Sequence, residues 1–363
     1  MNLDLKQLRL PAWLTLGSPA DTSAGGLKIK YPPVAMDLST GSVALARLAK
    51  DSEKKWTLTS HDIVEVPGEL LESDLFRVRI RSIDQYRALV AGALQKEGIK
   101  TTRISLVLPD HLARVALLPF EELPRTRRET LELVRWKMKK AVPFKVEEAA
   151  VDYQVLPPDP ASGGKGRVLL AVLMPASIVS EHEEIFQALG VHPGVVDLST
   201  FSLAHLYRTV IDDEVPAGGD FMLVNVTTTC FTVMIWRDGR PIFYRCKTFS
   251  FAAEDGGSNE AAFDAAAAYR LIHREAQASI VYFTERLAGK SFARIYMRVV
   301  GHDPERVGAA LEGAPSDAPP ELIDLRKVVK VTGRINVTGS ERSAELLQRL
   351  APAVGAALGR GGA

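Results

Sequence analysis

Cysteine, long apolar runs and any excess of one charge are nearly missing from this chain. Its 363 residues include 2 cysteines, Cys230 and Cys246, too few for a disulfide framework or a four-ligand metal cluster. The 45 basic side chains almost balance the 44 acidic ones, so net charge gives no general attraction to nucleic acid or to an anionic membrane. No apolar run approaches the roughly 20 residues that span a bilayer, and the N-terminus lacks the apolar block of a secretory signal. These absences favour a globular cytoplasmic protein that is not itself inserted in a membrane.

The short motifs of common α/β enzymes are missing as well. The sequence contains no GxGxxG after a strand, no GxxxxGK(S/T), no GxSxG and no HExxH. An unrelated α/β enzyme therefore has no motif in its support.

Strand-like and helix-like segments alternate along the chain, which indicates an α/β protein. Short apolar runs predict strands at 103–109 and 167–175, and a hairpin is expected over 221–245 with an Asp-Gly turn. Apolar residues at three- and four-residue spacing predict a helix over 125–142, and an Ala-rich helix is expected over 261–289. The basic face of the 125–142 helix fits either a solvated surface beside acidic neighbours or a contact with an acidic partner or membrane.

The segment VAMDLSTGSVALARL, residues 34–48, has the pattern of a hairpin turn that binds phosphate. An apolar run reaches Asp37, small polar residues and Gly41 follow, and apolar residues then resume. Backbone N–H groups in such turns can face a phosphate. The segment raises the question of whether this turn still binds one.

A longer block, LPFEELPRTRRETLELVRWKMKKAVPFKVEEAAVDYQVL at residues 118–156, carries the most specific pattern. It combines an LP strand end, a charged helix, and PF, EE and DY pairs, at Leu118, Pro119, Val134, Arg135, Trp136, Pro143, Phe144, Glu147, Glu148, Asp152 and Tyr153. Together with residues 34–48 and the long C-terminal helix, this block resembles the PilM family, the actin-like cytoplasmic components of type IV pilus assembly machines. The register is good from about residue 34 to residue 207 and fainter from residue 221 onward.

The resemblance implies an α/β, actin-like (ribonuclease H-like) fold whose two lobes flank a nucleotide cleft. The first lobe should carry an FtsA/PilM-type inserted small subdomain, and the second a strongly reduced one. We expect an N-terminal leader at 1–29, a first lobe at 30–75 and 157–217, an inserted subdomain at 76–156 and a second lobe at 218–363, with 252–262 replacing the usual small subdomain.

The family's nucleotide site has two DxG-type turns facing the phosphates and a glycine-rich turn facing the adenine. Here the first turn keeps the carboxylate of Asp37, but serine replaces its glycine and Ala44 its lysine. In the second turn Asn225 replaces the acid, and Phe231 replaces a threonine. Such turns need glycine because a side chain blocks close backbone approach to the ligand. The residues of this vestigial site are Asp37, Ser39, Thr40, Gly41, Ser42, Asn225, Thr227 and Gly301.

These losses, with the missing wall at 252–262, predict a pseudo-ATPase with no catalytic residue, no metal site and no cofactor. The alternative is an active or slow actin-like ATPase that uses ATP and Mg²⁺, for which Asp37 is the best support.

The resemblance also implies that the N-terminal tail of a PilN-like inner-membrane protein binds between the first lobe and the inserted subdomain. Candidate groove residues are Leu117, Pro119, Phe120, Trp136, Pro143, Phe144 and Tyr153. Alternatively, Trp136 and Phe144 fill the core of the inserted subdomain, since aromatic residues are common in cores and at binding sites.

We therefore expect a non-enzymatic scaffold at the inner face of the cytoplasmic membrane, held there by its partner and contacting other proteins of the pilus or secretion platform. Homo-oligomerisation is left open. The apolar stripe Leu3, Leu5, Leu8, Leu10 and Trp13 fits an added strand, a lipid contact or a neighbour's groove, and equally a disordered leader.

Overall fold

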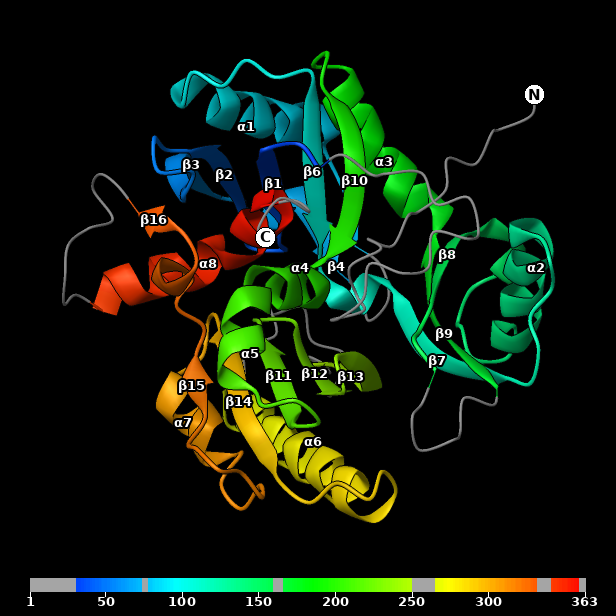
Figure 1. Ribbon diagram of the computed structural model, residues 1–363. Coiled ribbons are helices and arrows are strands. Elements are labelled where there is room, and N and C mark those ends of the chain that lie inside the picture. Colours follow the sequence, from blue (N-terminus) through cyan, green and yellow to red (C-terminus); the bar gives the residue numbers. More distant parts are fainter. Residues whose placement is uncertain (1–30, 74–77, 159–165, 250–264, 332–340, 359–363) are drawn as a thin grey trace.

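The computed structural model describes residues 31–73, 78–158, 166–249, 265–331 and 341–358. These residues form two sheets, each covered by helices, and a smaller unit beside them (Figure 1). The expected leader at 1–29 and the loop at 252–262 lie outside the described residues.

The first sheet has six strands in the order β10-β6-β1-β2-β3-β16. Its strands are β1 (Val34–Leu38), β2 (Ser42–Lys50), β3 (Trp56–Glu65), β6 (Arg103–Leu108), β10 (His192–Leu198) and β16 (Lys330–Val331). The first three form an antiparallel meander, β6 and β10 run parallel to β1, and β16 runs parallel to β3. All five residues of β1 are buried, Asp37 among them, as expected for a central strand whose sequence is otherwise apolar.

The second sheet repeats this plan in the order β13-β12-β11-β14-β15. Its strands are β11 (Asp220–Val226), β12 (Cys230–Arg237), β13 (Arg240–Thr248), β14 (Phe292–Val299) and β15 (Glu321–Leu322). An antiparallel meander is again followed by parallel strands, so β11 corresponds to β1 and β13 to β3. The predicted hairpin turn is confirmed, since Asp238 and Gly239 both have positive φ, at 50° and 69°.

Helices complete the two lobes. They are α1 (Ile83–Lys96), α2 (Arg127–Met138), α3 (Ala176–Gln187), α4 (Ser199–Leu206), α5 (Arg208–Glu214), α6 (Ala265–Glu285), α7 (Pro304–Ala309) and α8 (Glu341–Leu358). The Ala-rich helix expected over 261–289 is α6, which buries Ile272, Ala276 and Phe283 in the core that it shares with the second sheet. A short hairpin of β4 (Leu71–Ser73) and β5 (Val78–Ile80) precedes α1.

The inserted unit is a three-stranded antiparallel sheet with α2 packed on it. Its strands lie in the order β7-β9-β8 and are β7 (Arg114–Phe120), β8 (Ala149–Val155) and β9 (Arg167–Pro175). A capping box between Thr126 and Glu129 starts α2, and Leu131, Val134 and Met138 bury its apolar side. The insert thus spans about 114–175, a correction to the boundary of 76–156 expected from the sequence. The reason is that β6, which falls inside the expected range, pairs with β1 and β10 in the first sheet.

The C-terminal segment also corrects the expected division, because 218–363 was assigned to the second lobe. Instead, β16 pairs with β3, and α8 packs on α4 and on strands β1 and β2 of the first lobe. This packing is close: a Cβ added at Gly355 of α8 would lie 2.0 Å from the carbonyl oxygen of Ser202 in α4. The chain therefore crosses between the lobes before and after the second sheet.

Candidate functional site

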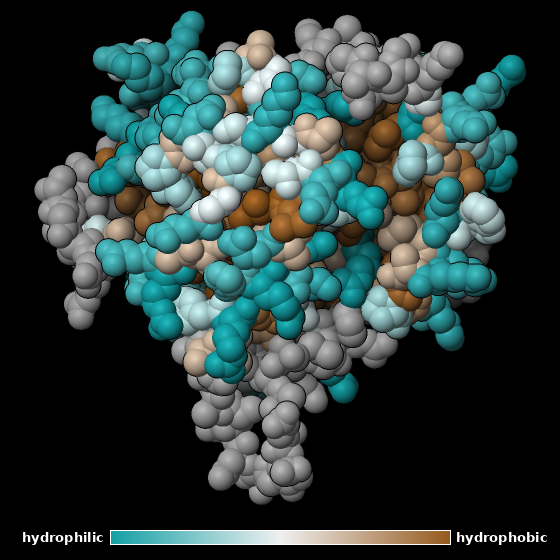
Figure 2. All heavy atoms as spheres, turned by 90° about the horizontal axis from the view of Figure 1, so that it is seen from below, coloured by the Kyte–Doolittle hydropathy of each residue, from teal (hydrophilic) through white to brown (hydrophobic). Residues whose placement is uncertain are grey.

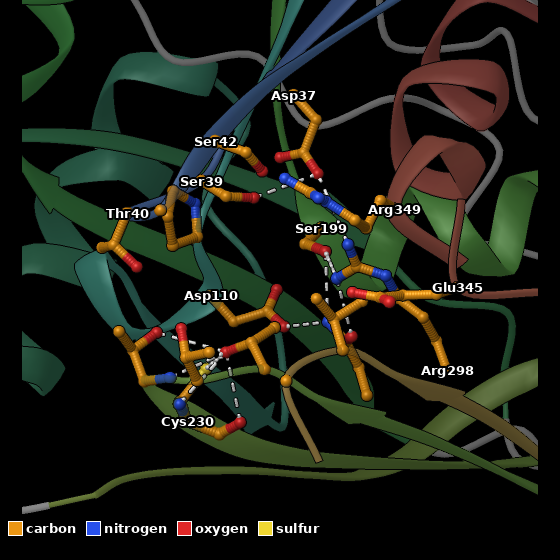
Figure 3. A pocket seen from close by; sticks show the side chains of 18 of the residues that line it. Asp37, Ser39, Thr40, Ser42, Asp110, Ser199, Cys230, Arg298, Glu345 and Arg349 are labelled. Carbon is orange, nitrogen blue, oxygen red and sulfur yellow. Dashed lines mark hydrogen bonds and ion pairs between the residues drawn. The ribbon is translucent and has the colours of Figure 1, made fainter. Parts of the chain in front are cut away.

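A pocket of about 320 Å³ lies where the two sheets face each other (Figure 3). It is lined by the β1–β2 turn, the β11–β12 turn, the ends of β6 and β14, and α8. All the residues that we assigned to a vestigial nucleotide site line this pocket: Asp37, Ser39, Thr40, Gly41, Ser42, Asn225, Thr227 and Gly301. The structure thus brings the two turns together, and the loss of nucleotide binding there stays a prediction.

Arg298 on β14 is the central side chain of the pocket, and sequence reasoning missed it. Its side chain is 2% exposed, and its guanidinium lies 3.6 Å from the equally buried carboxylate of Asp37. It donates hydrogen bonds of 3.1 Å to Asn225 Oδ1 and 3.3 Å to Ser199 Oγ, and its Nε donates to the carbonyl oxygen of Gln348 at 2.8 Å. One cation therefore connects both turns with α4 and α8. The two arginines inside the otherwise apolar strand ARIYMRVV, Arg294 and Arg298, were the available sequence signal.

Asp110, in the 3₁₀ turn Asp110–Leu112 after β6, is a second buried acid that the sequence reading missed. It accepts hydrogen bonds from the backbone N–H of Thr200 at 2.9 Å, from the Thr200 hydroxyl at 2.5 Å and from Asn225 Nδ2 at 2.9 Å. Burial is the largest cause that raises the pKa of this carboxyl, and these bonds oppose it. Asp110 is thus fully bonded within the protein.

The Asp110 contact explains why asparagine suits position 225. Its amide donates to Asp110 through Nδ2 and accepts from Arg298 through Oδ1. An ionised aspartate there could not donate and would face the Asp110 carboxylate directly, which is unfavourable in a buried site. The surroundings of position 225 therefore favour asparagine over the acid that the related family has there.

The carboxyl of Asp37 also reflects its burial. Desolvation raises its pKa from 3.8 to about 6, although Arg298 and a 3.3 Å hydrogen bond from Ser39 Oγ favour the ionised form. The Asp37 carboxyl is therefore ionised at neutral pH, and its negative charge pairs with the guanidinium of Arg298. In Figure 3 the two side chains point toward each other across the pocket.

The residue kept from the glycine-rich run has a structural reason of its own. Gly301 has φ of 75°, and a Cβ there would lie 2.3 Å from Thr228 Cγ2. The close approach of this loop to the β11–β12 turn therefore requires glycine with or without a ligand.

The side of the pocket formed by α8 has one acidic and one basic side chain, Glu345 and Arg349. Arg349 donates a 2.5 Å hydrogen bond to Glu65 on β3, and Glu345 lines the pocket beside it. In the described part of the chain, no group of three or more His, Cys, Asp or Glu side chains could hold a metal ion. The residues present therefore do not fit Mg²⁺ with ATP: Arg298 already bonds to both turns, and the second turn has no acid.

The candidate groove residues do not behave alike. Phe120, Phe144 and Tyr153 are partly buried and pack against the insert's own core, whereas Leu117 packs against the core of the first lobe. Pro119 and Pro143 are exposed. Trp136 stands on α2 with 70% of its surface exposed, so the alternative that it fills the core is wrong. For Phe144 that alternative holds in part, and peptide binding by these residues stays a prediction.

Three side chains of the basic face of α2 form ion pairs within the insert. Arg127 donates to Asp152, Arg135 lies 2.9 Å from Glu132, and Lys139 lies 3.3 Å from Glu147. This pairing favours the interpretation of a solvated face beside acidic neighbours.

Comparisons with known proteins identify the fold and the family. No helix in the described segments is long and apolar enough to cross a membrane. No curated protein sequence matches the chain. Among solved structures, a PilM-PilN type IV pilus biogenesis complex has a TM-score of 0.70 at 16% identity, covering 92% of this chain and 98% of that one. A Bacteroides thetaiotaomicron protein with an actin-like ATPase fold and unknown function has a TM-score of 0.45 at 10% identity, covering 84% and 93%.

The expected two-lobed, actin-like α/β fold is confirmed. The family model described as type IV pilus assembly protein PilM matches residues 35–273, more than half of the sequence. The chain belongs to the PilM family of type IV pilus assembly proteins.

Proposed function

We propose that this protein is a cytoplasmic scaffold of a type IV pilus assembly platform, that it binds the tail of a PilN-like membrane protein, and that it does not hydrolyse ATP. Membership of the PilM family supports the role in pilus assembly. The relative of similar fold comes from a PilM-PilN complex, which supports a partner of the PilN type. Such a partner would hold the protein at the inner face of the cytoplasmic membrane.

Tail binding follows the physics of an extended peptide in a groove. Backbone hydrogen bonds give part of the affinity, and apolar pockets give the specificity. Trp136 is the best candidate anchor, because it is large, aromatic and 70% exposed without a place in the insert's core. Leu117, Phe120 and Tyr153 each present only part of their surface and contribute to the walls.

The absence of hydrolysis is carried by one observation, the buried guanidinium of Arg298. It lies between Asp37 and Asn225, the positions of the two acids that organise Mg²⁺ in the related family. A metal ion there would meet a fixed positive charge at close range in a site of low dielectric, which is strongly unfavourable. A bound nucleotide without its metal would meet the carboxylates of Asp37, Asp110 and Glu345 around the same pocket.

Calorimetric titration of Mg·ATP into the purified full-length protein tests this part. We expect no heat of binding at micromolar nucleotide. A dissociation constant in the micromolar range would overturn the proposal that the protein does not use ATP. It would favour the second candidate, a slow actin-like ATPase, which the retained Asp37 supports.

Tail binding is tested separately with a synthetic peptide of the cytoplasmic tail of a PilN-like protein from the same organism. Saturable binding of that peptide, and none of a scrambled peptide, is expected. No binding of either peptide would remove the partner assignment and leave the result for nucleotide unaffected.

A further inference from the structure

The two sheets share one plan but differ at one edge. In the first lobe, the outer edge of β3 is covered by β16, which pairs with it through Lys330 and Val331. β13 is the corresponding strand of the second lobe, and no strand in the described residues pairs with its outer edge. An uncovered edge presents unpaired N–H and C=O groups, which can accept another strand.

The outer edge of β13 borders a groove of about 480 Å³. Six consecutive residues of the strand, 242–247, line it. Successive side chains of a strand point to opposite faces, so a groove over one face would be lined by alternate residues only. The consecutive run shows that the groove follows the edge of β13 and its backbone.

The insert forms the opposite wall. Arg114, Val115 and Leu117 of β7 line the groove across from β13, and β7 is itself the outer strand of its sheet. Within the described residues no backbone hydrogen bond joins the two strands. Some Cα atoms of β7 and β13 lie within 8 Å of each other, which is closer than the roughly 9.6 Å needed for a strand bonded to both edges. An occupant cannot bond to both edges where they approach this closely, and β13 borders the groove over the longer run.

The side chains of the groove select the chemistry of that occupant. Aromatic and aliphatic groups form its floor, with the rings of Phe243 and Tyr282 5.2 Å apart. Figure 2 shows such hydrophobic residues inside a hollow beside the insert. Three cations also line the groove, from Arg114, Arg245 and Lys247, and among the described residues no carboxylate lines it.

Arg245 is held in place over this floor. Its guanidinium carbon lies 5.3 Å from the centre of the Phe243 ring, and Glu275 pairs with it at 3.5 Å. Lys247, exposed at the rim, adds a further positive charge, which complements acidic side chains there.

We propose that the groove binds an extended segment of a partner protein in which acidic and apolar residues alternate, and that this segment pairs with β13 as a sixth strand of the second sheet. The apolar residues would point to the aromatic floor and the acidic ones to the cations at the rim. This site lies between the insert and the second lobe, whereas the PilN-like tail is expected between the insert and the first lobe. Leu117 is a candidate for both sites, and the proposal rests on β13 and the cations of the groove rather than on that tail assignment.

The test uses a fluorescein-labelled acetyl-Glu-Val-Glu-Val-Glu-Val-amide peptide and the full-length protein. Two matched peptides are compared: one with N-methyl groups on the amides of both edges, and one with lysine in place of glutamate. Fluorescence polarisation should show saturable binding of the first peptide and a loss of at least about tenfold for each of the others. Equal affinity for the N-methylated peptide would rule out pairing with a strand edge and overturn the proposal.

The position is tested by Lys247→Glu, an exposed residue at the rim, with Lys290→Glu, an exposed residue outside the groove lining, as control. We expect Lys247→Glu to weaken the acidic peptide by about tenfold and the control to leave it unchanged. Hydrogen exchange should show slower exchange of amides in 242–247 on binding. Slower exchange at β8 or β16 instead, with 242–247 unchanged, would contradict the assignment.

A second copy of this chain is the other occupant to separate. If sedimentation shows a dimer that Lys247→Glu dissociates, the groove binds another copy of the chain and the proposal is overturned. A sedimentation coefficient equal for both proteins supports a foreign segment.

Discussion

Arg298 and Asp37 belong to different sheets, are each 2% exposed, and have their charged groups 3.6 Å apart. This pair joins the lobes at the point where a nucleotide site is expected from the family. Removing one partner of a buried pair leaves the other charged and unpaired, which typically costs about 3–5 kcal/mol.

Arg298→Met should therefore lower the free energy of unfolding by about 3–5 kcal/mol, measured by urea denaturation at pH 7. Arg326→Met is the control, since Arg326 pairs with Asp324 at the surface and its loss should cost about 1 kcal/mol or less. Equal effects of the two substitutions would show that the Arg298 pair adds nothing to the connection between the lobes.

A buried acid on β10 predicts an unusual dependence of stability on pH. Desolvation raises the pKa of Asp197 from 3.8 to about 7, opposed by hydrogen bonds from Ser202 Oγ and the N–H of Leu198. Between these two pKa values the folded state binds a proton that the unfolded chain has lost. Asp197 therefore contributes a loss of stability as pH rises from about 4 to about 7, of up to about 1.4 kcal/mol per unit.

Asp197→Asn removes this titration, and its amide can still accept from the N–H of Leu198 and donate to the Ser202 hydroxyl. Urea denaturation of both proteins at several pH values between 4 and 8 gives the difference. The stability of the variant relative to the wild type should increase as pH rises. A difference that is constant with pH would show that Asp197 titrates at its ordinary pKa.

Trp136→Ala separates stability from partner binding. Because the side chain is 70% exposed, its loss should change the free energy of unfolding by less than about 0.5 kcal/mol. Affinity for the PilN-like tail peptide should fall by about tenfold or more if Trp136 is an anchor. Tyr153→Ala is the comparison, since its ring packs on the insert's core and its loss should lower stability as well. Unchanged peptide affinity in Trp136→Ala would remove this residue from the groove.

Two glycines in helices give a matched test of the C-terminal packing. Gly355→Ala places a Cβ 2.0 Å from the backbone oxygen of Ser202, so α8 must shift from α4 at a cost of about 1–3 kcal/mol. Gly92→Ala in α1 meets nothing within 4 Å and should stabilise by about 0.5–1 kcal/mol through helix propensity. Thermal unfolding of both variants checks this, and a stabilised Gly355→Ala protein would show that α8 does not pack here.

The local sequence pattern predicted the two turns of the site but not the buried side chains that connect them. The turn at Asp37 and the one at Asn225 could be located because each follows a buried strand at a fixed offset, and both line one pocket. Arg298 and Asp110 could not be assigned to it, since their partners lie 261 and 115 positions away along the chain, at Asp37 and Asn225. Those pairings depend on how the two lobes dock, which no local periodicity encodes.

The domain boundaries predicted from the sequence were wrong for a related reason. The apolar run of β6 has the same pattern whether the strand belongs to the insert or to the first sheet, and only its pairing with β1 and β10 decides. In the same way, the apolar stripe of α8 predicts a packed helix but not which sheet it packs on. Element types follow from the sequence here, and their assignment to lobes follows from long-range contacts.

Calorimetric titration of the PilN-like tail peptide into the full-length protein, without and with saturating concentrations of Mg·ATP, tests the central claim. If the protein is a scaffold whose cleft is joined by Arg298 rather than by a nucleotide, the peptide binds with the same dissociation constant in both titrations. Binding that appears, or tightens by tenfold or about 1.4 kcal/mol, only when Mg·ATP is present would contradict it.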